Sequence, residues 1–141
     1  MFAVKQTIIK KFTLSKTERL KSRKLIESLF HDGKSFSVFP FRIYYSYSKN
    51  SVSSLQAGYG VSIKRFKKAV DRNRVKRLMR EAYRLQKPGL FSFLEERNFS
   101  LILFFIYTGK EMAAHEDVFT KMQLIIKRLI IILNEAYPPP A

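Results

Sequence analysis

The alternation of hydrophobic and polar residues divides the chain into helices and strands. Apolar residues that recur every three or four positions predict three helices, over residues 17–30, 69–86 and 116–135. Aromatic and β-branched residues predict three strands, over residues 37–48, 56–63 and 99–107. The last of these is nearly all apolar, which is typical of a central strand that is covered on both faces. The order helix, strand, strand, helix, strand, helix indicates an α+β fold in which helices pack on one small sheet.

Turn-forming residues mark the ends of these elements. Gly33 suits the left-handed position that often follows a helix, and Pro40 places the first strand at an edge of the sheet or marks its beginning. The polar residues 49–51 and 53–54 predict a hairpin loop between the first two strands. Residues 87–89, Lys-Pro-Gly, predict the end of the second helix and leave residues 91–97 as a linking segment.

Length and composition set the class of protein. The chain has 141 residues, enough for one domain with one core, which we expect to span residues 16–136 between a basic lead-in (1–15) and a proline-rich tail (137–141). A disordered basic tail would not contain 46% hydrophobic and 14% aromatic residues. Cysteine is absent, so the chain has no disulfide or thiolate metal site. The longest apolar run, residues 124–133, is too short for a membrane span and contains two cations, so we expect a soluble, cytoplasmic protein without a membrane partner.

The charge of the chain indicates the kind of partner. Lys and Arg number 27 and Asp and Glu number 11, so the net charge is +16. A folded domain with such an excess typically binds a nucleic acid or an anionic membrane. Eleven of the cations lie between residues 64 and 87, where Asp71 and Glu81 are the only acids. Because repulsion among like charges opposes folding, this segment indicates a surface that a polyanion neutralises.

The second predicted helix separates these charges from an apolar face. A sector about 120° wide contains five apolar side chains, Val75, Leu78, Met79, Ala82 and Leu85. The rest of the circumference carries Arg72, Asn73, Arg74, Lys76, Arg77, Arg80 and Arg84. One face can therefore pack on a sheet while the other binds closely spaced phosphates, which arginine contacts in a bidentate manner. Asn73 would either bind a phosphate or 2′-hydroxyl or cap the first turn.

The first predicted strand is rich in aromatic residues, on which nucleobases can stack. Phe39, Phe41 and Tyr45 fall on one face of the strand, and we expect them to be buried. Tyr44 lies on the opposite face beside Arg42. It is therefore the better candidate for a solvent-facing platform that stacks on a base.

No arrangement of residues predicts catalysis by the protein alone. His31 and His115 stand apart without metal-ligand spacing, and the acids form no pattern of a protein metal centre. Gly58 and Gly60 mark weak points of a strand or positions of close approach, and they lack the Lys-Ser/Thr of a phosphate-binding loop. A general RNA-binding or ribosomal-type structural protein therefore remains an alternative, ahead of a protein-only nuclease or a DNA-binding helix-turn-helix.

The basic helix carries a specific signature. Residues 67–84 contain the pattern R-N-R-x-K-R-x-x-R, and residues 58–64 before them contain G-x-x-V-S-x-K. Upstream, residues 19–21 (R-L-K) and 26–35 (I-x-x-L-F-x-x-G-K-S) continue the match. Over residues 13–135 the chain resembles the protein subunit of bacterial ribonuclease P.

This resemblance implies a particular version of the α+β fold. A single small sheet of about four strands would pack with three helices, in a ribosomal-protein-S5-domain-2-like arrangement. The family also implies a left-handed β-α-β crossover through the basic helix. Pattern reasoning alone would predict the right-handed form.

The resemblance also implies a function. The chain would be the accessory subunit of a ribonucleoprotein endonuclease in which RNA is the catalyst and the protein supplies no catalytic residue. Its partners would be the catalytic RNA and the 5′ leader of precursor tRNA, and not DNA. Removal of the leader would use Mg²⁺ held mainly by RNA, with no metal assigned to the protein. Binding of the leader and stabilisation of the ribozyme at low Mg²⁺ would be the contribution of the chain.

The resemblance finally assigns site residues by position. The surface for the catalytic RNA would include Lys64, Arg65, Lys68, Arg72, Asn73, Arg74, Lys76, Arg77 and Arg80. The leader cleft would be lined by Ile26, Phe30, Phe41 and Tyr44. The family often has Phe where this chain has Ile26, and an aliphatic side chain cannot stack on a base as an aromatic ring does.

Overall fold

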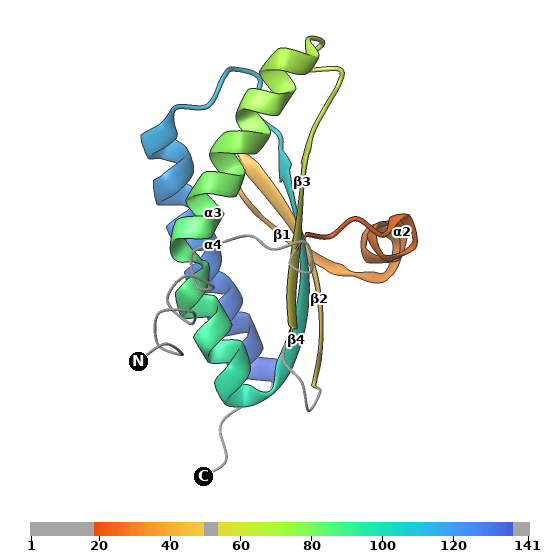
Figure 1. Ribbon diagram of the computed structural model, residues 1–141, viewed down its shortest axis with the longest axis vertical. Helices are drawn as coiled ribbons and strands as arrows, with labels where there is room; N and C mark the ends of the chain where they lie inside the picture. Colours follow the sequence, from red (N-terminus) through yellow and green to blue (C-terminus); the bar gives the residue numbers. More distant parts are fainter. Residues whose placement is uncertain (1–18, 50–53, 137–141) are drawn as a thin grey trace, which may run out of the picture.

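Figure 1 shows the computed structural model, which describes residues 19–49 and 54–136. Its elements, in chain order, are α2 (Arg23–Asp32), β1 (Lys34–Val38), β2 (Phe41–Lys49), β3 (Ser54–Val61), α3 (Ala69–Arg97), β4 (Phe99–Tyr107) and α4 (His115–Ala136). The four strands form one sheet in the order β1-β2-β4-β3, in which only the β3–β4 pair is parallel. The predicted α+β fold with one sheet and three helices is therefore confirmed over the described residues.

The sheet has one closed face and one open face. Helices α3 and α4 pack on the closed face, and α2 crosses the other (Figure 1). In β4 the odd-numbered residues, from Phe99 to Tyr107, are buried against α3 and α4, whereas the even-numbered residues are only partly covered. The predicted bounds and central position of this strand are correct. The prediction that it is covered on both faces holds fully for one face alone.

The predicted strand over residues 37–48 is in fact an antiparallel hairpin. Strands β1 and β2 pair with Val38 opposite Phe41, so Phe39 and Pro40 form the turn. Pro40 has no backbone N–H to donate to the sheet, which suits a turn better than the interior of a strand. Phe39 consequently leaves the buried face on which it was predicted, and its side chain is 75% exposed.

The connection between β2 and β3 also differs from the prediction. The two strands are not paired, because β4 lies between them, so they do not form a hairpin; residues 50–53 lie outside the described part of the chain. Strand β4 takes the central position: all nine of its residues pair with β2, eight of them (100–107) also pair with β3, and its apolar side chains are covered there. Parallel neighbours β3 and β4 are joined through α3, as the resemblance implies, and the handedness of that crossover stays a prediction.

Helix α3 runs 29 residues and includes the segment predicted to end it. The prediction failed because Pro88 ordinarily disrupts a helix by removing one hydrogen bond and crowding the preceding turn. Here Leu90 and Leu94 continue the apolar stripe and are fully buried, so packing on the core compensates for that loss. The helix ends at Asn98, which adopts the left-handed conformation (φ 59°) and donates its N–H to the carbonyl of Glu95.

Helix α2 begins later than predicted, at Arg23 rather than near residue 17. Ser22 caps it by accepting a hydrogen bond from the N–H of Leu25 at 3.4 Å. Leu20 lies outside the helix, where it is buried and donates its N–H to the carbonyl of Ala57 in β3. Gly33 is extended (φ −75°) and not left-handed; glycine is needed because a Cβ would lie 2.3 Å from the carbonyl oxygen of Leu29.

The last helix was predicted within one residue at each end. Its buried stripe consists of Val118, Met122, Ile125, Ile126, Leu129 and Leu133. Among the described residues, no helix has the length and hydrophobicity that crossing a membrane would require. The predicted N-terminal lead-in and proline-rich tail lie outside the described residues.

Candidate nucleic-acid interface

The first half of α3 presents an apolar face inward and a cationic face outward. Val75, Met79 and Ala82 are buried in the core, as predicted. Leu78 is partly buried, but Leu85 is 40% exposed, so the apolar sector is narrower than predicted. The helix therefore projects most of its circumference into solvent.

The cationic face lies where the signature residues were predicted. Arg74, Arg77, Arg80 and Asn73 are exposed, and Lys76 is partly exposed. Arg74 and Arg77 make no hydrogen bond or ion pair with any other described residue, so their guanidinium groups remain available to a ligand. We refer to the face formed by residues 72–80 as the basic surface.

Among the described residues, neither of the acids at the ends of this surface, Asp71 and Glu81, forms an ion pair with its cations. Glu81 pairs instead with Arg84, one turn further along the helix. The hydrogen bond from the Arg84 guanidinium holds the pKa of Glu81 below its usual range, so Glu81 stays ionised and Arg84 stays paired at neutral pH. The positive charge of the basic surface is thus left for an anionic ligand.

Two of the predicted RNA-binding arginines also hold the protein together. Arg72 donates through Nη1 to the carbonyls of Phe66 and Lys67, at 2.7 and 2.8 Å, and so fixes the loop that precedes α3. Arg65 in that loop donates to the carbonyl of Thr108 after β4. The sequence alone could not show that these two arginines contact the protein itself as well as RNA. A long arginine side chain can reach either, and which it reaches depends on where the neighbouring loops lie in the fold.

The remaining predicted cations border the basic surface. Lys64 and Lys68 are exposed in the same loop, and Lys68 is the N-cap residue of α3 without a side-chain capping bond. Arg80 extends over the ring of Tyr59, with its guanidinium carbon 5.6 Å from the ring centroid. The basic surface and the cations that border it therefore extend from the loop before α3 to the edge strand β3.

The open face of the sheet carries a cluster of three aromatic rings. Phe30 of α2 contacts Tyr44 of β2 and Phe104 of β4 edge-on, with centroids 4.8 and 5.0 Å apart. Arg42 donates from Nε to the hydroxyl of Tyr44 at 3.1 Å and from Nη2 to Ser35 at 3.3 Å. The open face thus combines aromatic rings with a positioned guanidinium, two kinds of group with which proteins bind single-stranded RNA.

The leader-cleft residues predicted from the resemblance divide between the two faces. Phe30 is 42% exposed, and Tyr44 and Ile26 are partly exposed, with Ile26 one turn before Phe30 on α2. Phe41 is only 1% exposed and packs on Tyr107 in the core, so it does not reach the open face. That assignment was wrong because residues 41 and 44 of one strand point to opposite sides of the sheet.

Phe104 is the residue that sequence reasoning missed. It lies between Phe30 and the glycines of β3, and it faces away from the helices that cover the sheet. The signal in the sequence was the alternation of side chains along β4, which places all even-numbered residues on one face. The structure pairs Phe104 with Tyr44, so that face is the one that carries Tyr44. A nearly all-apolar strand hides this signal, since both of its faces appear hydrophobic.

Gly58 and Gly60 are close-approach sites, as the sequence suggested. A Cβ at Gly58 would lie 2.7 Å from the ring of Phe104, and one at Gly60 would lie 2.9 Å from it. Because the ring is held by Phe30, it cannot move aside without disturbing the aromatic cluster.

We expect Gly58→Ala to lower the free energy of unfolding by about 1–3 kcal/mol, the usual cost of overpacking. Urea denaturation monitored by circular dichroism would measure it. Gly89→Ala is the matched control, because a Cβ there meets nothing within 4 Å and the helix favours alanine. An unchanged stability of Gly58→Ala would mean that Phe104 is free to shift.

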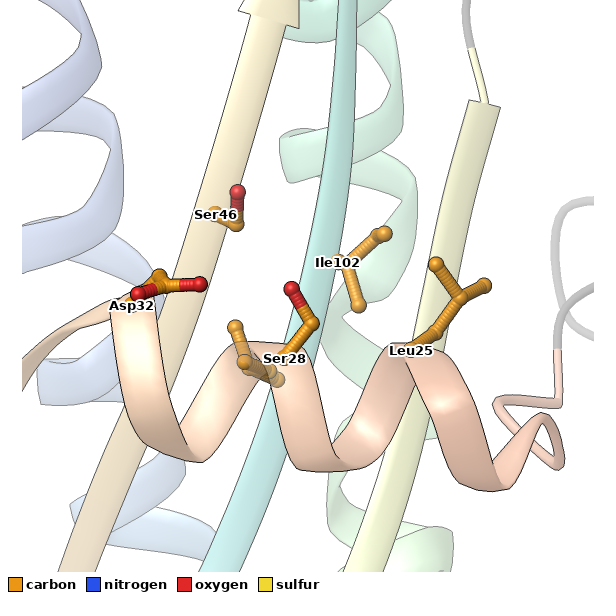
Figure 2. A pocket seen from close by; sticks show the side chains of 7 residues that line it. Leu25, Ser28, Asp32, Ser46 and Ile102 are labelled. Carbon is orange, nitrogen blue, oxygen red and sulfur yellow. The ribbon is translucent and has the colours of Figure 1, made fainter.

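A shallow recess extends the open face beside α2. Figure 2 shows it between α2 and the strands β2 and β4, with a volume of about 120 Å³. Leu25, Ser28 and Asp32 line it from α2, Ser46 from β2 and Ile102 from β4. Among the described residues, no group of three or more His, Cys, Asp or Glu is placed to hold a metal ion.

Comparison with known proteins tests the resemblance drawn from the signature. The family model for ribonuclease P matches residues 14–130, more than half of the chain. The chain belongs to the ribonuclease P protein family. A ribonuclease P protein component of Porphyromonas gingivalis strain W83 is 41% identical over 119 residues, covering 84% of this chain and 87% of the relative. One from Chlorobium phaeobacteroides is 41% identical over 88 residues, covering 60% of each.

Solved structures of ribonuclease P proteins have the same fold. The protein from Thermotoga maritima is 28% identical, with a TM-score of 0.59 over 79% of this chain and 96% of that protein. The protein from Staphylococcus aureus superposes with a TM-score of 0.61 over 81% of this chain and 96% of that protein, at 20% identity. The ribonuclease P protein family supplies the protein subunit of the enzyme that acts in 5′ processing of tRNA.

Proposed function

We propose that this chain binds the catalytic RNA of ribonuclease P through the basic surface and the 5′ leader of precursor tRNA through the open face. The observation that carries this proposal is the placement of the two surfaces. The basic surface belongs to a helix on the closed face of the sheet, whereas Phe30, Tyr44 and Phe104 lie on the opposite face. One rigid core therefore separates two RNA-binding surfaces, and both RNAs can be bound together.

The two surfaces differ in the chemistry they offer. The basic surface presents exposed arginines, which contact the phosphates of a folded RNA irrespective of its sequence. The open face presents aromatic edges, a guanidinium and hydroxyl groups, which suit the exposed bases and backbone of a single strand. We therefore assign the folded catalytic RNA to α3 and the leader to the open face.

Electrostatics explains why such a protein assists cleavage. The catalytic RNA and precursor tRNA are both polyanions, and their repulsion is ordinarily screened by Mg²⁺. A protein of net charge +16 that contacts both lowers this requirement. In this proposal the RNA carries out the hydrolysis, and Mg²⁺ held mainly by RNA phosphates would supply the activation of water. We also propose that the protein acts in the cytoplasm, where bacterial tRNA matures, without a DNA or membrane partner.

The test is cleavage of precursor tRNA at low Mg²⁺ by a bacterial ribonuclease P RNA, with and without this protein. We expect a large gain in rate that requires the RNA and that shrinks as Mg²⁺ is raised. Tight RNA binding without a gain in rate would favour a structural RNA-binding protein instead. Cleavage by the protein in the absence of RNA would overturn the assignment of the chemistry.

A further inference from the structure

Phe39 is an exposed aromatic residue that neither the basic surface nor the open face includes. It lies in the turn between β1 and β2, and at 75% exposure it is the most exposed aromatic side chain among the described residues. Phe30 of the aromatic cluster is only 42% exposed. A single exposed apolar residue needs no explanation by itself, so its surroundings decide whether Phe39 has a role.

The turn that carries Phe39 is tied to the end of β4. The carbonyl of Pro40 accepts two hydrogen bonds from Thr108, from its N–H at 2.7 Å and from its hydroxyl at 2.9 Å. The carbonyl of Thr108 in turn accepts a hydrogen bond from Arg65. The backbone beneath Phe39 is therefore fixed, which reduces the entropy that a ligand must remove on binding.

The same hydrogen bonds connect Phe39 to the basic surface. Arg65 belongs to the loop before α3, whose carbonyls at Phe66 and Lys67 are held by Arg72. The register pairs Tyr107 with both Val61 and Phe41, so the ends of β3 and β4 and the start of β2 lie together, near the start of α3 (Figure 1).

The surroundings of the turn are predominantly cationic. Exposed cations in this region are Lys64, Arg65, Lys67, Lys68 and Lys110, and two exposed acids, Glu111 and Asp117, lie near Tyr107. A protein partner that covered an apolar residue here would have to desolvate these charges, whereas RNA neutralises them.

We propose that Phe39 stacks on an unpaired base of RNA whose neighbouring phosphates are bound by Lys64 and Arg65. An exposed ring beside cations is the combination that single-stranded nucleic acid recognises, since every base has a face on which to stack. The base belongs either to the catalytic RNA or to precursor tRNA, and the chemistry is the same for both. This inference rests on the proposed function and extends the RNA-binding surface from α3 to the end of the sheet.

The test compares Phe39→Ala, Phe39→Leu and Phe39→Trp in the full chain. Two dissociation constants are measured, that of the protein for the catalytic RNA and that of the assembled holoenzyme for precursor tRNA. We expect Ala and Leu to weaken one of them by about 5- to 10-fold, the lower part of the range for base stacking, and Trp to retain wild-type affinity. Weakening of the first constant identifies the catalytic RNA, and weakening of the second alone identifies precursor tRNA.

The control is Ile131→Ala, another exposed apolar residue (56%) in the C-terminal part of α4, which we expect to leave both constants unchanged. Because Phe39 is outside the core, its variants should melt like the wild type. Equal affinity of Phe39→Leu and wild type would overturn stacking. A change confined to self-association, measured by sedimentation, would also overturn it. If the wild type bound no catalytic RNA, the proposed function itself would fail. Wild-type values of both dissociation constants for Phe39→Ala would overturn only this inference.

Discussion

The double variant Arg74→Ala/Arg77→Ala is expected to bind the catalytic RNA about 100-fold more weakly, at roughly tenfold for each charge-assisted hydrogen bond to phosphate that is removed. Both side chains are exposed, and neither forms a hydrogen bond or ion pair with another described residue, so the fold should be unaffected. Arg72 is left intact because it holds the loop before α3. Filter binding across a salt series would measure the effect, with the log–log slope reduced by about 1.4 to 1.8 if each arginine neutralises one phosphate.

Two further variants separate direct phosphate binding from total charge. Lys121→Ala/Lys127→Ala removes the same charge from α4 and should change affinity far less. Arg74→Lys/Arg77→Lys keeps the charge but not the bidentate geometry, so we expect an intermediate affinity. If the α4 variant weakened binding as much as the α3 variant, net charge rather than the basic surface would govern binding.

Tyr44→Ala should weaken binding of leader-bearing precursor tRNA by the holoenzyme by about 10- to 100-fold while leaving mature tRNA nearly unaffected. The ring of Tyr44 packs on Phe30, and its hydroxyl accepts a hydrogen bond from Arg42, so its removal disrupts the open face at its centre. Equilibrium binding with matched precursor and mature tRNA would provide the comparison.

The variant Tyr44→Phe tests which part of the side chain matters. It retains the edge-on ring packing and removes only the hydrogen bond from Arg42, so we expect a smaller effect than for alanine. Equal weakening for precursor and mature tRNA would place Tyr44 outside the leader-binding surface. A lowered melting temperature of Tyr44→Ala would attribute part of its effect to the fold.

Local sequence patterns were sufficient to predict the bounds of those elements whose ends do not depend on tertiary contacts. The bounds of β4 and α4 follow from continuous or periodic apolar residues, and the structure agrees within one residue. The hairpin at Phe39 and Pro40 and the passage of α3 through Pro88 were missed. In both cases the outcome depends on tertiary contacts: Pro40 is held by Thr108, and the end of α3 is held by buried Leu90 and Leu94.

The part of the candidate site that consists of charged residues could be predicted from the sequence. The part that depends on which face of the sheet a side chain occupies was harder to predict. The cationic face of α3 follows from helical spacing, and Arg74 and Arg77 lie as predicted. The faces of the sheet do not follow as easily, because assigning Phe41 or Phe104 to a face requires the pairing of β2 with β4. The family resemblance supplied the predicted residues of the leader cleft, but these included Phe41, whose side chain points to the other face of the sheet.

The place of β4 in the sheet has a consequence for synthesis of the protein on the ribosome. Strands β1, β2 and β3 and all 29 residues of α3 emerge before β4, yet β2 and β3 each pair with β4 and not with one another. A nascent chain that ends before β4 therefore exposes unpaired strand edges together with the apolar stripe of α3. The sheet can therefore be completed only after β4 has been synthesised, and chains truncated before β4 should be substrates for chaperones and proteases.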